Sequence, residues 1–169
     1  MFHRVNMALD GSKALIFIDE GWKALDDPVF ANKIKDWLKT IRKMNGVIGF
    51  GSQSASDAAN SSIADSLIEQ CPTQIFMPNS KAKEADYMGA FALTEAEFRV
   101  VRESPIGSRQ FLIKQGAASA VAKLDLAGLD DEIAVLSGRT ETVNLLKTIR
   151  EEVGDDPADW LPIFHQRRN

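Results

Sequence analysis

The order of apolar and polar segments along the chain predicts a sheet of short strands connected by helices. A continuous apolar run, Ala14-Leu15-Ile16-Phe17-Ile18, contains β-branched residues and is followed at once by Asp19-Glu20. A short unbroken run of this kind is typical of a strand that is buried on both faces in a parallel sheet. The segment Val47-Ile48-Gly49-Phe50 has the same character and predicts a second buried strand, which is followed by Gly51-Ser52-Gln53.

The segment between these two strands has the periodicity of an amphipathic helix. Asp27 can cap this helix, with Pro28 in its first turn, and Asn45-Gly46 ends it. Strand, helix and strand in succession form a βαβ unit, whose crossover we expect to be right-handed and whose strands we expect to be parallel. Both strands then bring their carboxyl ends to one edge, where open α/β sheets bind ligands. The apolar residues at helical spacing are Phe30, Ile34, Trp37, Leu38 and Ile41.

The remaining sequence predicts further short elements within the same domain. Thr94-Glu95-Ala96-Glu97 has the spacing of a capping box at the start of a helix. No linker rich in proline, glycine or serine divides the chain, so we expect a single domain over residues 1–169. The expected elements are a helix over 58–69, a strand over 74–77, helices over 81–88 and 95–103, a β-hairpin formed by 109–114 and 119–126, helices over 130–136 and 141–153, and a last helical turn after Asp156-Pro157.

Composition excludes several classes of protein. The chain has 169 residues, of which 44% are hydrophobic and 26% charged, as in an average soluble globular domain. The net charge of −4 gives no general basic excess for nucleic acid, although a local patch stays possible. The single cysteine, Cys71, excludes an internal disulfide and a zinc site built from cysteines. No apolar run reaches the length of about 18 residues that spans a membrane, and the first residues do not form a signal peptide, so we expect a cytosolic protein.

The residues with the strongest chemical interest are the two acids after the first strand. In nucleotide hydrolases, an acid in the position of Asp19 holds Mg²⁺, usually through water, and the metal offsets charge on the phosphate oxygens. An acid in the position of Glu20 can act as the general base for the attacking water. Gln53, at the end of the neighbouring strand, could contact both this water and the γ-phosphate. For Asp19-Glu20, the alternative is a strand end that carries two solvated acids. For Gln53, the alternative is an ordinary polar residue in a loop.

Two arginines are candidates for contacts with phosphate. Arg42 lies near the end of the amphipathic helix, off its apolar face. It is either a solvated charge that favours the helix C-terminus or an arginine finger that reaches the nucleotide of a neighbouring subunit. Arg109 is either a second phosphate-sensing residue or a hairpin charge. A phosphate-binding loop would need Gly-Lys at its end, and none of the 11 glycines is followed by lysine.

In combination, these segments resemble the type IV secretion ATPases of the CagE/TrbE/TraC family, within the HerA/FtsK superfamily of hexameric motors. The resemblance covers about residues 9–150, with its blocks in the family's order. Residues 16–25 resemble the family's second nucleotide motif, and residues 38–46 resemble its arginine-bearing helix end. Residues 51–57 resemble its glutamine motif. Three later segments, 75–79, 108–116 and 136–139, are similar to later blocks of the family.

This resemblance implies a fold, a reaction and partners. The fold would be α/β, a RecA-like P-loop NTPase half with a mostly parallel sheet flanked by helices, plus a C-terminal β-hairpin and helices. ATP and Mg²⁺ would be the cofactors, and hydrolysis would drive channel or pilus assembly, conjugation, or protein or substrate transfer. The implied catalytic residues are Asp19, Glu20, Gln53 and Arg42, with Asp19 at the metal and Arg109 at the nucleotide.

The resemblance also implies a hexamer, contacts with other type IV secretion ATPases and inner-membrane channel subunits, and a cytoplasmic position at the inner membrane through these partners. Because the phosphate-binding loop is missing, we expect the chain to be the C-terminal portion of a larger ATPase and to be inactive alone. Two alternatives stay open, a non-hydrolysing interaction module with half of a motor fold and a DNA-translocating relative. The charge does not point to DNA.

Overall fold

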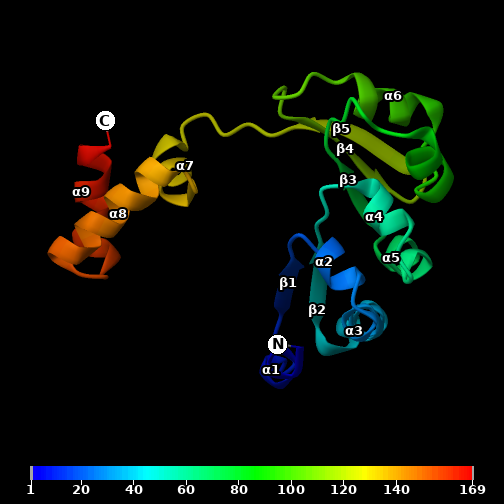
Figure 1. Cartoon of the computed structure of the whole chain (residues 1–169), viewed down its shortest axis with the longest axis horizontal. Helices are drawn as coiled ribbons and strands as arrows, with labels where there is room; N and C mark the ends of the chain where they lie inside the picture. Colours follow the sequence, from blue (N-terminus) through cyan, green and yellow to red (C-terminus); the bar gives the residue numbers. More distant parts are fainter. Residues whose placement is uncertain (1, 169) are drawn as a thin grey trace. The chain divides into compact units, whose positions relative to one another are not determined.

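A computed structural model describes residues 2–168 of the chain (Figure 1). The chain divides into two compact units, Met1–Leu124 and Asp125–Asn169, and the boundary directly follows the last strand. The first unit contains two sheets with their helices, and the second is helical. Each unit is described by itself below. A single domain over residues 1–169 stays a prediction.

The predicted βαβ unit is present at the start of the first unit. β1 (Ala14–Ile18) and β2 (Gly46–Phe50) pair in parallel, with Ala14 opposite Gly46 and Ile18 opposite Phe50. The chain between them forms the short helix α2 (Trp22–Leu25), the helix α3 (Pro28–Thr40) and the 3₁₀ turn η1 (Ile41–Met44). α3 begins as the sequence predicts, because the side chain of Asp27 accepts hydrogen bonds from the backbone N–H groups of Val29 and Phe30.

The apolar stripe of α3 forms a core with the helices that follow β2. Ile34 and Leu38 are buried in this core, where they meet Ile63 and Leu67. The expected helix over 58–69 is wrong in detail, since the segment forms α4 (Ala55–Ala59) and α5 (Ala64–Gln70). Asn60 Nδ2 donates a hydrogen bond to the backbone carbonyl of Ser56, and the Ser61 hydroxyl donates one to Ala58. Such local bonds compete with a continuous helix and explain the interruption.

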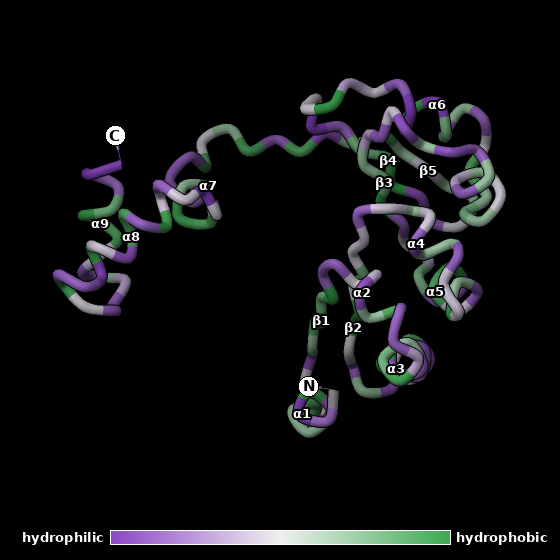
Figure 2. The backbone as a smooth tube through the Cα atoms, viewed as in Figure 1, coloured by the Kyte–Doolittle hydropathy of each residue, from purple (hydrophilic) through white to green (hydrophobic). Residues whose placement is uncertain are grey.

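The prediction that β1 is buried on both faces is wrong. Leu15 and Phe17 are 64% and 74% exposed, whereas Ile16 and Ile18 are half-buried. Side chains alternate between the two faces of a strand, and α3 packs against only one of these faces. β1 therefore exposes one apolar face among the described residues, and its apolar character is visible in Figure 2.

The second sheet of this unit is antiparallel. β3 (Thr73–Phe76), β4 (Gln110–Gln115) and β5 (Ala118–Lys123) follow one another in the order β3-β4-β5, so the predicted hairpin is confirmed and the third strand joins it. Phe76 and Leu112 on this sheet pack against Phe98 and Val101 of α6 (Glu95–Glu103). The helix expected over 81–88 is instead a π-helical segment, η2 (Ala85–Ala90).

A nearly buried ion pair joins α6 to β4. Lys114 Nζ lies 2.9 Å from Glu97 Oε2 and also donates to the carbonyl of Ala92 at 3.0 Å. The capping box is confirmed, since Glu97 accepts from the backbone N–H of Thr94 and Thr94 Oγ1 accepts from that of Glu97. Burial raises the pKa of Glu97, but hydrogen bonds from Lys114, Thr94 and Ser119 outweigh it and lower this pKa from 4.5 to about 2.

The second unit consists of α7 (Asp130–Leu136), α8 (Thr140–Val153) and α9 (Pro157–Arg167). The first two agree with the predicted helices, but α9 has 11 residues where the sequence predicts only a last helical turn. Ile149 of α8 and Phe164 of α9 are its fully buried side chains among the described residues. Asp156 caps α9, and Arg168 forms an ion pair with Asp131 at the start of α7. Within residues 2–168, no helix is both long enough and apolar enough to cross a lipid bilayer.

Candidate functional site

The carboxyl ends of β1 and β2 form the predicted site edge. Backbone hydrogen bonds continue beyond the paired strands, from Gly51 N to the Ile18 carbonyl at 2.9 Å and from Gly21 N to the Gly51 carbonyl at 2.8 Å. These bonds hold the turn after β1 against the turn after β2. Asp19-Glu20 and Gln53 therefore lie at the same edge, as the parallel strands predict.

The turn at Glu20 has an unusual backbone. Glu20 has φ of 48°, in the left-handed region that residues other than glycine seldom adopt. Asp19 Oδ1 accepts a hydrogen bond from the Glu20 N–H at 2.9 Å, which stabilises this conformation. The next residue is Gly21, where an added Cβ would lie 2.2 Å from the Phe50 ring. Local hydrogen bonding and close packing thus define the turn that presents Glu20.

The carboxylate of Glu20 is held at both of its oxygens. Gln53 Nε2 donates to Oε1 at 3.2 Å, and Lys23 Nζ lies 2.9 Å from Oε2. The Lys23 ammonium also lies 5.4 Å from the centre of the Trp22 ring. Because the Glu20 side chain is still 45% exposed, water reaches this carboxylate. The arrangement can orient a carboxylate that accepts a proton from water.

Asp19 is placed where one carboxylate could hold a magnesium ion. Its side chain is exposed at the strand end, and one oxygen already binds the Glu20 N–H. Among the described residues, no group of three or more histidine, cysteine, aspartate or glutamate side chains could form a metal site. Mg²⁺ at nucleotide sites is usually held by one or two carboxylates together with phosphate and water oxygens. Asp19 fits that kind of coordination.

Of the two candidate arginines, Arg42 lies at the opposite end of β2 from the acidic pair, and Arg109 adjoins the other sheet. Arg42 is exposed in η1, which leads into the amino end of β2. The five-residue strand β2 separates it from the site edge by roughly 15 Å, at about 3.3 Å per residue. Arg109 directly precedes β4 in the other sheet, with φ of 59°, and its carbonyl accepts from Leu124 N at 2.8 Å. The structure thus brings together Asp19, Glu20 and Gln53 but neither arginine.

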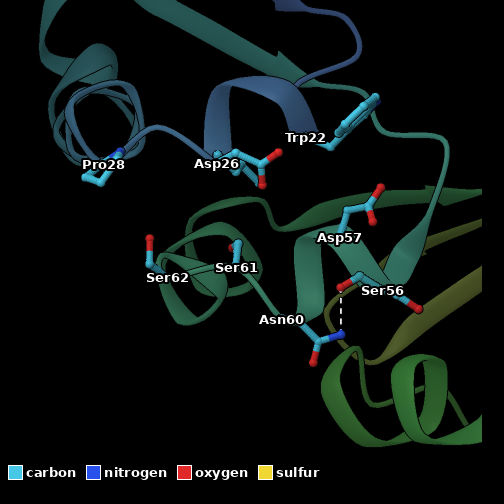
Figure 3. Close-up of a pocket in the computed structure, with 9 residues that line it drawn as sticks. Trp22, Asp26, Pro28, Ser56, Asp57, Asn60, Ser61 and Ser62 are labelled. Atoms are coloured by element: carbon cyan, nitrogen blue, oxygen red, sulfur yellow. Dashed lines mark hydrogen bonds between the residues drawn. The ribbon is translucent and has the colours of Figure 1, made fainter.

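A pocket of about 490 Å³ with a mixed polar and apolar lining adjoins the acidic turn (Figure 3). Trp22 lines it from α2, and Asp57 lines it from α4. The sequence analysis did not find this pocket, and it also missed Lys23. The spacing of three residues between Glu20 and Lys23 is the signal that could have revealed their ion pair. The pocket is lined by Trp22, Leu25, Asp26, Pro28, Ser56, Asp57, Asn60, Ser61 and Ser62.

Comparison with known proteins identifies the family. The family model of the TraG P-loop domain matches residues 1–103. The chain belongs to the TraG P-loop domain family. This match covers both strands of the parallel pair and all three residues that the structure brings together at its edge.

Relatives of this chain are proteins of type IV secretion systems. The type IV secretion system protein virB4 of Bartonella henselae is 54% identical over 99% of this chain, which covers 22% of that protein. The virB4 protein of Brucella abortus is 42% identical over 99% of the chain, and the chain covers 20% of it. The protein PtlC of Bordetella pertussis is 41% identical over 99% of the chain, and the chain covers 20% of it. The chain therefore spans about a fifth of the length of these relatives, and the expected resemblance is confirmed.

A solved structure confirms the fold class. VirB4 of Thermoanaerobacter pseudethanolicus superimposes with a TM-score of 0.61 at 18% identity, over 76% of this chain and 37% of that one. At this level of identity, the likeness concerns the fold alone. It agrees with an α/β chain that contains a parallel sheet and an antiparallel hairpin.

Proposed function

We propose that this chain is the C-terminal portion of the ATPase domain of a longer P-loop protein that energises type IV secretion. The observation that carries the proposal is the hydrogen bond from Gln53 to Glu20, at the carboxyl ends of two parallel strands. Two further findings support it, the membership in a P-loop family and the relatives in secretion systems. Hydrolysis would drive assembly of the channel or pilus, or the transfer of protein or DNA.

Asp19, Glu20 and Gln53 would each have a separate role in hydrolysis. A Glu20 carboxylate oxygen takes the proton of a water molecule while that water attacks the γ-phosphorus of ATP, and ADP leaves with the electrons of the broken bond. Gln53 holds the carboxylate from the neighbouring strand and orients it towards the water. Asp19 would hold Mg²⁺, which offsets negative charge on the phosphate oxygens when it is bound.

Groups outside this chain would complete the site. The loop of backbone N–H groups and lysine that binds the phosphates is absent from this sequence, and it would come from another part of the longer protein. Arg42 lies too far from Glu20 to serve the same nucleotide, so it would act on the nucleotide of an adjacent subunit in a hexamer. Arg109 is the second candidate for this role.

The longer protein would work on the cytoplasmic side of the inner membrane. It would be held there by other type IV secretion ATPases and by channel subunits.

The test is the substitution Glu20→Gln in the full-length protein. We expect nucleotide binding to be retained and kcat to fall by about 10²–10⁴-fold, because the amide keeps the shape of the side chain but cannot accept the proton. The matched control is Glu69→Gln, which changes an exposed glutamate of α5. Turnover in Glu20→Gln equal to that of the control would refute the proposal and leave the acids as a solvated strand end.

A further inference from the structure

Lys23 links the aromatic ring beside the site to the carboxylate at its centre. Its ammonium lies 2.9 Å from Glu20 Oε2 and 5.4 Å from the centre of the Trp22 ring. The lysine stands three residues after Glu20, at the start of α2, and so lies about one turn further along the chain. These contacts form a short chain of interactions from Trp22 through Lys23 and Glu20 to Gln53.

The two donors on Glu20 come from different elements and hold different oxygens. Gln53 approaches Oε1 from the loop after β2, and Lys23 approaches Oε2 from α2. A glutamate at an exposed turn would otherwise sample several rotamers, since it has three rotatable bonds and half of its surface in water. One donor alone fixes the position of one oxygen, and the second donor fixes the plane of the carboxylate.

From this geometry we propose that Lys23 is a positioning residue for the general base. It holds the Glu20 carboxylate in the orientation in which Gln53 also binds it, so that the carboxylate faces the water. This inference rests on the function proposed above, because it assigns Glu20 the role of base. Lys23 contacts the base through an ion pair, so a positioning role predicts that its loss lowers kcat and leaves the KM for ATP unchanged.

The size of the effect follows from the exposure of the pair. The lysine side chain is 64% exposed, and an exposed ion pair contributes at most about 1 kcal/mol. We therefore expect Lys23→Met in the full-length protein to lower kcat about fivefold, which is the rate equivalent of that free energy. Methionine keeps an apolar stem beside Trp22 and removes only the charge. Lys23→Arg, which keeps the charge and the reach to Glu20, should retain most of the activity.

A double substitution separates positioning from a merely structural role. In a Glu20→Gln background, Lys23→Met should cause no further loss of kcat, because no base remains to be oriented. A structural role would lower activity to the same degree in both backgrounds. Lys83→Met, which changes an exposed lysine before η2, is the matched control and should leave kcat unchanged.

The outcomes distinguish this inference from the proposed function. If Glu20→Gln is inactive while Lys23→Met keeps the kcat of the Lys83 control, the positioning role is refuted and the base assignment stands. A higher kcat, a raised KM alone, or equal losses in the two backgrounds would also overturn the positioning role. If Glu20→Gln hydrolyses ATP normally, the proposed function fails, and the inference on Lys23 fails with it.

Discussion

Gln53 donates a hydrogen bond from Nε2 to Oε1 of Glu20 at 3.2 Å, although the two residues are 33 positions apart in the chain. The parallel register of β1 and β2, in which Ile18 lies opposite Phe50, brings them together. Each residue follows its strand by a short turn, and the Gly51 backbone bonds to the turn after β1. The bond therefore depends on the pairing of the strands and not on a local sequence motif.

The first prediction concerns this hydrogen bond. We expect Gln53→Ala in the full-length protein to leave ATP binding intact and to lower kcat by about 10–100-fold, because a hydrogen bond to a charged group contributes about 1.5–3 kcal/mol. Steady-state hydrolysis and equilibrium nucleotide binding measure the two effects separately. Gln70→Ala, at the exposed end of α5, is the control. Equal activity in the two variants would show that the Gln53 amide plays no part in turnover.

The second prediction concerns Arg42. In the full-length protein, Arg42→Ala should fold and bind ATP normally but hydrolyse it about 10³–10⁵-fold more slowly, the contribution of an arginine finger. Mixing Arg42→Ala subunits with Glu20→Gln subunits should restore part of the turnover, since some junctions then join an intact base to an intact arginine. Lys39→Ala, an exposed lysine of α3, should behave as wild type.

The Arg42 assignment fails under either of two results. Arg42→Ala with normal hydrolysis would make this residue a solvated charge at the end of a helix, and Arg109 would become the next arginine to test. Mixed assemblies that contain both variants and stay inactive would exclude action across a subunit junction, provided that rings with only some intact sites are shown to turn over.

The third prediction concerns the chain by itself. Isothermal titration of the 169-residue chain with Mg-ATP should show no binding tighter than roughly millimolar Kd, about −4 kcal/mol. The reason is the missing phosphate-binding loop, whose backbone N–H groups and lysine supply most contacts to phosphate. The full-length protein should bind much more tightly in the same experiment. Micromolar binding by the chain alone would contradict its assignment as a portion of the nucleotide site.

The fourth prediction concerns the ion pair between Glu97 and Lys114. Since the folded protein lowers the pKa of Glu97 from 4.5 to about 2, the pair stabilises the fold fully above about pH 4.5. This stabilisation should disappear as the pH falls from about 4.5 to about 2, because Glu97 becomes protonated. Glu97→Gln should reduce this dependence on pH, which urea unfolding of the chain at pH 7 and pH 3 measures by circular dichroism.

A companion variant tests the same pair at neutral pH. The Lys114 and Glu97 side chains are only 12% and 9% exposed, so Lys114→Met leaves a carboxylate nearly buried without its partner. We expect the free energy of unfolding to fall by about 3 kcal/mol. Lys123→Met, on the exposed end of β5, should change it by less than about 0.5 kcal/mol. Equal stability of these two variants would contradict a stabilising role for the pair.

The sequence alone determined the elements that depend on neighbouring residues. Asp27 and Pro28 start α3, and Thr94 with Glu97 starts α6, because the capping groups lie within a few positions of the N–H groups that they bind. The parallel pairing of β1 and β2 also followed from sequence, since a strand, a helix and a strand in succession leave few other arrangements. This pairing also places Glu20 and Gln53 at the same edge of the sheet.

Tertiary structure alone decided which groups lie beside these elements. The apolar composition of β1 suggested burial on both faces, but burial depends on what packs against each face, and Leu15 and Phe17 remain exposed among the described residues. The pairing of β3 with the hairpin likewise depends on contacts between segments far apart in the chain. The ion pair between Glu20 and Lys23 is local in sequence, but the left-handed turn and the side-chain rotamers that form it are not encoded by apolar periodicity.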